Sequence, residues 1–479
     1  MPGYLSVAGV EQALQNLVAT YPAFVTLINL PNTSVEGRAS HAVKIGSGTG
    51  TKRGLLLIAG LHARELVNPD LVLTLAYNLC KAYSTHTGLT FGGKSYDATA
   101  VRLIVEGLDV FVFPLVNPDG RAFVQAPGGD RWWRKNRNPN PGQACKGVDL
   151  NRNFDFLWPS GIGTSANPCS EVYKGAGGFS EPEIRNVQWL PDNYPQIGFI
   201  ADVHSYSELI LYPWGDDENQ TTNAGMNFMN PAYNAVRGVV GDTSYKEYIP
   251  AAELNWYATT AGKVRDAIAA VRGRVYTAQQ EIQLYPTTGT SVDYTYARHF
   301  VDPAKHRVYA ITLETGREFQ PADAEALQII SEVSAGLIEF CLASLCAVEE
   351  TMAGTALEKE ADRLRLFRDR EMLKTKAGRR YVQLLATHSV ELLRLSKSEK
   401  ALHEEALAVL QRVAPVIPEP RQRQAKVIDR ELLKSVASLL KKTKDKSSPA
   451  LGLALDALAK DLRFFKNRTV VEGLKAASQ

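Results

Sequence analysis

The sequence predicts an α/β fold followed by a separate helical module. Three apolar segments, residues 55–59, 197–203 and 308–313, are typical of buried strands, and a polar residue follows each of them. After about Glu350 the composition changes, because leucine, alanine and charged residues come to dominate. A chain of 479 residues is long enough for one large domain and a smaller one. We therefore expect an α/β domain over residues 1–348 and an all-α domain over residues 349–479.

The first apolar segment leads into the motif Gly60-Leu61-His62-Ala63-Arg64-Glu65. His62 and Glu65 are three residues apart, so on a helical turn they would share one face. A neutral imidazole and a carboxylate are ligands that suit zinc. Because this two-residue pattern occurs by chance in many proteins, the motif taken alone favours a solvated turn over a metal site.

The other two segments end in residues that could complete such a site. His204 ends the second segment, and Glu314 ends the third. In open α/β sheets, sites form in the crevice outside the carboxyl ends of the strands. A catalytic zinc takes three protein ligands and leaves one position open. Each residue could be an ordinary polar strand end, but three of them together favour a shared site.

Further motifs in a fixed order give the chain a resemblance to the M14 zinc metallocarboxypeptidases of the pancreatic carboxypeptidase A/B type. The resemblance covers roughly residues 4–345 and implies a mixed, mostly parallel central sheet flanked by helices. It also implies hydrolysis of the C-terminal peptide bond of peptides or proteins. The matching segments are residues 60–65, 117–120, 133–135, 147–153, 168–171 and 204–207, then Tyr285 ahead of Gly289 and Asp293, and finally Glu314.

The resemblance implies one zinc ion held by His62, Glu65 and His204. A metal-bound histidine usually donates its other N–H to a carboxylate, and Asp149 matches the residue that would do this for His62. Glu314 resembles the general base of the family.

Four residues match positions that contact the substrate or the developing oxyanion. Arg134 matches the arginine that faces the oxyanion, although it could also be a surface residue of the basic run 131–137. A terminal carboxylate is recognised well by the planar fork of an arginine. Asn151 and Arg152 match the carboxylate clamp of the family, and Tyr285 matches its mobile cap.

Two further positions bear on substrate contacts and specificity. Arg64 matches an auxiliary carboxylate or subsite contact. The base of the side-chain pocket lies seven residues after the cap tyrosine in the family, which gives Val292. Valine there implies a preference for C-terminal aromatic or aliphatic residues. The neighbouring pair Gln280 and Glu281 could instead line the pocket and admit basic or polar side chains, or could lie at a solvated loop edge.

The signals for cellular location disagree. Cys145 and Cys169 match a disulfide of the family, and disulfides imply an oxidising, extracellular setting. The first residues lack the basic start and apolar core of a signal peptide. The chain has no run of 18 apolar residues, so no membrane span is expected. As written, the chain is therefore expected in the cytoplasm, whereas the cysteine pair indicates secretion.

The second domain is predicted to be a basic helical bundle. Residues 351–479 contain 27 Lys and Arg and 16 Asp and Glu, a net charge of +11, which leaves about −8 for the rest of the chain. With few aromatics and no recognition motif, nucleic-acid binding is disfavoured. Docking on the first domain, oligomerisation or binding of another protein are the expected roles. Helical patterns recur over residues 357–395, 397–413, 427–440 and 449–465.

Three functions remain open. The first is a zinc-dependent carboxypeptidase with an accessory helical domain. The second is a protein-interaction scaffold in which the peptidase domain is secondary. The third is a relative that trims cell-wall peptides or polyglutamate side chains. The complete set of ligands, base, clamp and cap favours the first, because a protein that only binds has no need of all of them.

Overall fold

The computed structural model describes residues 3–48, 52–239, 241–352, 355–357, 360, 363–364, 367–418 and 426–479. The chain forms two compact units, one of residues 1–48 and 53–341 and the other made mainly of residues 342–479. The division lies within helix α8 (Asp323–Ser344), slightly before the expected boundary at residue 348.

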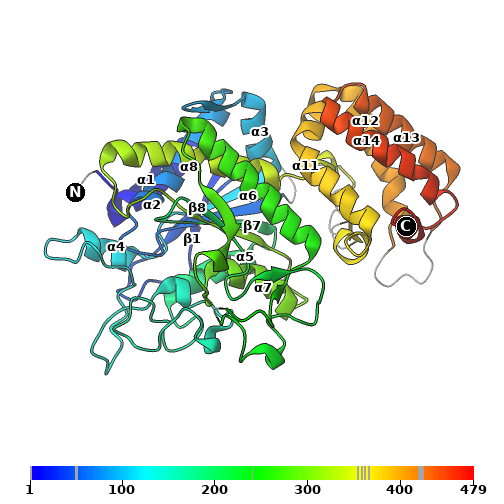
Figure 1. Cartoon of the computed structure of the whole chain (residues 1–479). Helices are drawn as coiled ribbons and strands as arrows, with labels where there is room; N and C mark the ends of the chain where they lie inside the picture. Colours follow the sequence, from blue (N-terminus) through cyan, green and yellow to red (C-terminus); the bar gives the residue numbers. More distant parts are fainter. Residues whose placement is uncertain are drawn as a thin grey trace. The chain divides into compact units, whose positions relative to one another are not determined.

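The first unit is built on an eight-stranded mixed sheet in the order β1-β2-β6-β3-β7-β12-β8-β11 (Figure 1). The four adjacent strands β6, β3, β7 and β12 are parallel, and antiparallel pairs occur towards the edges of the sheet. This architecture confirms the predicted fold class. The strands are β1 (Val25–Asn29), β2 (His41–Ile45), β3 (Arg53–Ala59), β6 (Leu108–Phe113), β7 (Ile197–His204), β8 (Leu209–Tyr212), β11 (Thr277–Gln280) and β12 (Tyr309–Glu314).

Helices cover both faces of this sheet, which explains why its central strands are continuously apolar (Figure 1). On one face, α5 (Pro182–Asn193) and α7 (Ser291–Val301) share a buried core cluster with alternate residues of the strands. On the other face, Phe199 of β7 contacts Trp256 of α6 (Ala251–Arg272) and Phe340 of α8, with ring centroids 5.6 and 6.4 Å apart.

Further helices and short strands complete the unit. The helices α1 (Val7–Thr20), α2 (Val67–Ser84) and α3 (Ala98–Gly107) pack on β1, β2, β3 and β6. Helix α8 is long and apolar enough to cross a membrane by composition, but 67% of its most apolar stretch is buried, as in a core helix. The remaining elements are α4 (Pro118–Gln125), the pairs β4 (Leu89–Phe91) with β5 (Lys94–Tyr96) and β9 (Asn219–Gln220) with β10 (Glu247–Tyr248), and the 3-10 turns η1 (Leu150–Arg152), η2 (Trp158–Ser160), η3 (Pro231–Tyr233) and η4 (Glu281–Gln283).

Gly60 makes the turn by which the chain leaves β3. Its φ angle is 70°, a conformation that residues with a side chain rarely adopt. A Cβ atom at this position would lie 3.0 Å from Leu115 Cδ1 and 3.3 Å from the Pro114 carbonyl oxygen. A glycine is therefore required here, two residues before His62.

The second unit is helical, as expected. Its apolar core includes Phe367, Tyr381, Leu432 and Phe465. The helix expected over residues 357–395 is interrupted, because η6 ends at Met372 and Thr375 caps a new helix from Lys376 by accepting a hydrogen bond from the Gly378 amide. Part of the stretch 357–375 lies outside the described residues. The helical elements are α9 (Ala347–Met352), η6 (Arg368–Met372), α11 (Lys376–Ser398), α12 (Lys400–Val413), η7 (Ala414–Val416), α13 (Arg430–Lys444), α14 (Pro449–Asp461), η8 (Leu462–Phe465) and α15 (Val470–Ala476).

Candidate metal and substrate site

Three neighbouring parallel strands place the candidate metal ligands and the candidate base at one edge of the sheet. In the register of the sheet, Ala59 at the end of β3 pairs with Val203 of β7, and His204 pairs with Glu314 of β12. His62 and Glu65 follow β3 in the turn that starts at Gly60. The order of the strands therefore brings residues more than 100 positions apart into one site.

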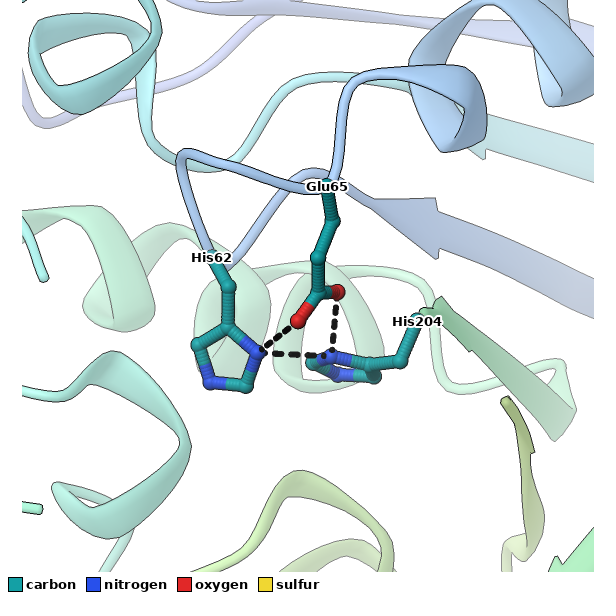
Figure 2. A group of neighbouring side chains, drawn as sticks. All are labelled: His62, Glu65 and His204. Atoms are coloured by element: carbon teal, nitrogen blue, oxygen red, sulfur yellow. Dashed lines mark hydrogen bonds and ion pairs between the residues drawn. The ribbon is translucent and has the colours of Figure 1, made fainter. Parts of the chain in front are cut away.

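His62, Glu65 and His204 form a compact, buried cluster (Figure 2). His62 Nδ1 lies 2.7 Å from one carboxylate oxygen of Glu65, and His204 Nδ1 lies 3.1 Å from the other. The two Nδ1 atoms are 3.0 Å apart. The three side chains are at most 3% exposed. Among the residues that the structure describes, this is the one group of His, Cys, Asp and Glu residues close enough to hold an ion.

The donor set of this cluster fits zinc. Two imidazole nitrogens and a carboxylate are the ligand types of a catalytic zinc site with three protein ligands. Two ring nitrogens that face each other at 3.0 Å and also face a carboxylate are best satisfied together by a cation. Burial raises the pKa of Glu65, but the two histidines outweigh this effect and hold it well below its usual value.

Carboxylates on the far side of both rings orient the histidines. His62 Nε2 lies 3.1 Å from Asp149 Oδ1, and His204 Nε2 lies 3.0 Å from Asp202 Oδ2. Burial opposes the charged form of His204, but Asp202 and Glu65 outweigh it and raise the pKa of this ring. Sequence reasoning named Asp149 and missed Asp202. Its position two residues before His204 on one strand, and hence on the same face, is the signal that could have found it.

Glu314 and Arg134 lie beside the cluster, and each has a polar group that forms no hydrogen bond with the described residues. The Glu314 carboxylate is half-buried and forms no hydrogen bond or ion pair with any residue that the structure describes. Burial raises its pKa to about 8, although His204 acts to lower it. Arg134 donates from Nε and Nη2 to Asp149 Oδ2 at 3.0 and 2.9 Å. The third nitrogen of this guanidinium, Nη1, has no hydrogen bond within the described ranges.

The candidate carboxylate clamp follows Asp149 directly in the chain. Asn151 Oδ1 accepts a hydrogen bond from the Ser291 amide at 2.9 Å, which leaves its Nδ2 group as a donor. Arg152 donates from Nη1 to the Asn151 carbonyl and from Nη2 to the Tyr285 hydroxyl, at 2.6 and 3.2 Å. Arg152 is buried, whereas 46% of Tyr285 is exposed. The structure therefore brings Asn151, Arg152 and Tyr285 together.

Arg64 lies at the edge of this group. Its guanidinium stacks over the Phe319 ring at 4.2 Å and donates to the Trp132 carbonyl at 3.2 Å. It also lies 3.4 Å from a carboxylate oxygen of Glu171.

Of the residues expected to set specificity, Val292 lies in the apolar core, whereas Gln280 and Glu281 are buried among polar groups. Val292 is 1% exposed and belongs to the core cluster under α5 and α7. The side-chain amide of Gln280 is fully hydrogen-bonded to the backbone. Its Nε2 atom donates to the carbonyls of Trp214 and Asp217, and its Oε1 atom accepts from the Asn219 amide. Glu281 is buried, and its Oε2 atom has no hydrogen-bond partner among the described residues.

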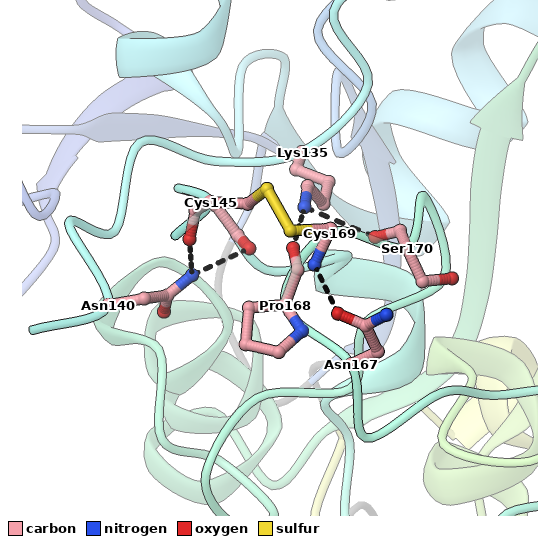
Figure 3. Close-up of a disulfide and its surroundings, with 8 residues drawn as sticks. Lys135, Asn140, Cys145, Asn167, Pro168, Cys169 and Ser170 are labelled. Atoms are coloured by element: carbon pink, nitrogen blue, oxygen red, sulfur yellow. Dashed lines mark hydrogen bonds between the residues drawn. A yellow bond between two sulfur atoms is a disulfide. The ribbon is translucent and has the colours of Figure 1, made fainter. Parts of the chain in front are cut away.

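A disulfide joins Cys145 and Cys169 near Arg134 in the chain (Figure 3). It links the loops 137–148 and 165–171. Lys135, which precedes the first of these loops, contacts the second by donating from Nζ to the carbonyls of Pro168 and Ser170 at 2.6 and 3.1 Å. The pairing agrees with the expectation from the sequence. Among the described residues, Cys80 and Cys341 are buried free thiols.

Comparison with known proteins establishes the class to which this fold and site belong. The model of the family described as zinc carboxypeptidase, Peptidase_M14, matches residues 10–335. This match covers more than half of the chain, and the chain therefore belongs to the zinc carboxypeptidase family.

Individual relatives agree with this assignment. Carboxypeptidase A2 of Mus musculus is 34% identical over 212 residues, which are 44% of this chain and 47% of that protein. Carboxypeptidase B of Helicoverpa zea is 35% identical over 228 residues, 46% of this chain and 48% of that protein. The chain thus spans about half the length of these curated relatives. The structure of bovine thrombin-activatable fibrinolysis inhibitor in complex with tick carboxypeptidase inhibitor shares the fold, with a TM-score of 0.55 and 23% identity over 71% of this chain and 97% of that one.

Proposed function

We propose that the chain is a zinc-dependent carboxypeptidase that hydrolyses the last peptide bond of peptides or proteins and releases single residues. The observation that carries this proposal is the short segment from Asp149 to Arg152. Its first residue contacts the metal ligand His62, and its last two residues form the candidate carboxylate clamp. A terminal carboxylate held there would place the last peptide bond, and no internal one, beside the metal cluster.

His62, Glu65 and His204 would hold the zinc ion. A bound zinc ion supplies Lewis acidity, which polarises the scissile carbonyl and activates the attacking water. The chain's own groups then have to move the proton. The Glu314 carboxylate can accept the proton of the attacking water and deliver it to the leaving amine.

Arg134 supports the charge that develops on the carbonyl oxygen. Its Nε and Nη2 atoms are fixed by Asp149, so Nη1 is presented in a defined direction. A preorganised donor of this kind stabilises the transition state by about 3 kcal/mol in comparable enzymes.

The clamp supplies recognition of the free C terminus. Arg152 offers the fork geometry that matches a carboxylate, and Asn151 adds an amide donor. Tyr285 is half-exposed and already contacts Arg152 Nη2, so it can close over a bound terminus. A substrate with an amidated C terminus would lack the charge that this clamp requires.

The proposed substrates are the C termini of peptides or proteins in an oxidising compartment. The disulfide between Cys145 and Cys169 supports such a compartment, because these bonds persist outside the reducing cytosol. We accordingly propose an extracellular location.

The proposal is tested by incubating the purified chain with free and amidated peptides and identifying the products by mass spectrometry. We expect ladders of single-residue losses from the free peptides alone, which stop when a chelator removes zinc and resume when zinc is added. Cleavage at internal bonds, or cleavage that persists after complete removal of zinc, would contradict the proposal.

A further inference from the structure

A chain of contacts through Ser291 joins the candidate clamp to the metal ligand His204. Asn151 Oδ1 accepts a hydrogen bond from the Ser291 amide at 2.9 Å. The Ser291 hydroxyl donates to Asp202 Oδ2, and this oxygen lies 3.0 Å from His204 Nε2. All four residues are buried. The clamp and the metal ligand are thus connected through two side chains that belong to neither group.

Both contacts of the Asp202 carboxylate fall on the same oxygen atom. Oδ2 accepts from the Ser291 hydroxyl and faces His204, whereas Oδ1 has no hydrogen-bond partner in the described part of the chain. Most buried side-chain oxygens have a partner, so a contact that served only to satisfy this carboxylate would not be expected to leave Oδ1 unpaired. The hydroxyl instead fixes the oxygen that faces the metal ligand.

The backbone that precedes Ser291 is packed directly on the clamp segment. The Gly289 carbonyl accepts from the Phe154 amide at 3.1 Å, and the Gly289 amide donates to the Phe156 carbonyl at 3.0 Å. A Cβ atom on Gly289 would lie 2.5 Å from the Arg152 carbonyl oxygen, and its φ angle is 70°. A change in the position of the clamp is therefore transmitted to Ser291.

We propose that Ser291 is a positioning residue that couples recognition of a C-terminal carboxylate at the clamp to the placement of His204 at the metal. This inference rests on the proposed carboxypeptidase function. A carboxylate bound to Asn151 Nδ2 restricts this side chain, whose Oδ1 atom holds the Ser291 amide. Ser291 then fixes Asp202, and the His204 ring has less freedom to lose when zinc binds. By linkage, zinc and the carboxylate each raise the affinity for the other.

The connection from the clamp to the other histidine starts from the backbone. Asp149 Oδ1 accepts from the Asn151 backbone amide at 3.0 Å and lies 3.1 Å from His62 Nε2. A carboxylate that binds the Asn151 side chain does not engage this amide. The contact with Ser291 is made by the same side-chain group that would bind the substrate. The coupling is therefore expected to depend mainly on Ser291.

The coupling is measured on the full-length chain as the ratio of the zinc dissociation constants without and with isocaproate. This probe has the side chain and carboxylate of leucine but lacks its chelating amine. Competition with a chromogenic chelator gives each constant. In the wild type, isocaproate should tighten zinc binding by about fivefold or more, whereas isocaproamide, which lacks the charge, should change it by less than about twofold.

Ser291→Ala removes the hydroxyl but keeps the amide that donates to Asn151, so its ratio should fall below half the wild-type value. Ser291→Cys replaces the hydroxyl with a weakly donating thiol of similar size and should act in the same direction, even if the alanine variant does not fold. Ser334→Ala is the matched control, because Ser334 on α8 is fully buried and its hydroxyl has no hydrogen-bond partner among the described residues. This variant should keep the wild-type ratio.

A carboxylate that bound zinc directly would give the same ratio in the wild type and in the Ser291 variants. A ratio in these variants of half the wild-type value or more would therefore overturn the proposal, and so would a wild-type ratio below about fivefold. Release of C-terminal residues without this coupling would overturn the role of Ser291 alone. Coupling that depends on Ser291, without release of any residue, would support its role and contradict the proposed function.

Discussion

At the scale of single residues, Asp149 connects the candidate metal site with the substrate site. Its Oδ1 atom contacts His62 Nε2 and accepts a hydrogen bond from the Asn151 amide at 3.0 Å. Its Oδ2 atom accepts from Arg134. Burial raises the pKa of Asp149, but Arg134 and His62 outweigh burial and hold it well below its usual range. The charge of one carboxylate thus orients a metal ligand and a cation together.

We predict that Asp149→Asn weakens zinc binding by about 10- to 100-fold, because an amide lacks the charge that orients His62 and Arg134. Competition with a chromogenic chelator measures the zinc affinity. Asp155→Asn, at an exposed position nearby in the chain, should leave it unchanged. An Asp149→Asn variant with the zinc affinity of the wild type would show that His62 does not depend on this carboxylate.

Glu183 gives a pH dependence to the stability of the first unit. Burial raises its pKa to about 7 in the folded chain, from about 4.5. The folded state therefore holds a proton that the unfolded state releases, and the free energy of unfolding falls as the pH rises from about 4.5 to 7. A shift of this size corresponds to about 3 kcal/mol. Urea unfolding of Glu183→Gln at pH 5, 6 and 7 should show a smaller fall than the wild type. An unchanged slope would refute the assignment.

At the scale of elements, the site is built at strand ends and on loops that the disulfide holds together. The strands β3, β7 and β12 are fixed by the sheet, but Arg134, Asn151 and Arg152 lie on or beside the loops that Cys145 and Cys169 connect. The two cysteines are separated by 24 residues. The disulfide therefore stabilises the segment that carries the clamp.

The double variant Cys145→Ser/Cys169→Ser should lower the free energy of unfolding by about 3 kcal/mol, because the unfolded chain regains the entropy of a loop of this length. Urea denaturation of the oxidised wild type and the variant measures the difference, and the reduced wild type should match the variant. If the oxidised and reduced wild type unfold at the same urea concentration, the disulfide makes no contribution.

At the scale of the whole molecule, the division into two units has a thermodynamic consequence. Each unit has its own apolar core, and the candidate zinc ligands all belong to the first. Calorimetry should therefore show two unfolding transitions. Zinc at 1,000 times its Kd should stabilise the first unit alone, by about 4 kcal/mol. A single transition that zinc shifts as a whole would contradict independent units.

The sequence predicted the convergence of His62, Glu65, His204 and Glu314 because all follow apolar strands, and parallel strands end at one edge of a sheet. It did not single out Asp202, although this aspartate lies two residues before His204 and therefore on the same face of the strand. The unpaired Oε2 atom of Glu281, found among the described residues, depends on tertiary contacts that the sequence does not reveal. The break between Met372 and Lys376 was not predicted, because the helical pattern of the sequence continues through the cap at Thr375.

The central claim, that these residues form a zinc site that uses Glu314 to move the proton, is tested most directly by Glu314→Gln. The amide keeps the size of the side chain but cannot accept the proton. The account predicts one zinc ion per chain by metal analysis and a rate of C-terminal residue release at least about 100-fold below that of the wild type. A zinc-loaded Glu314→Gln variant that releases residues at nearly the wild-type rate would contradict it.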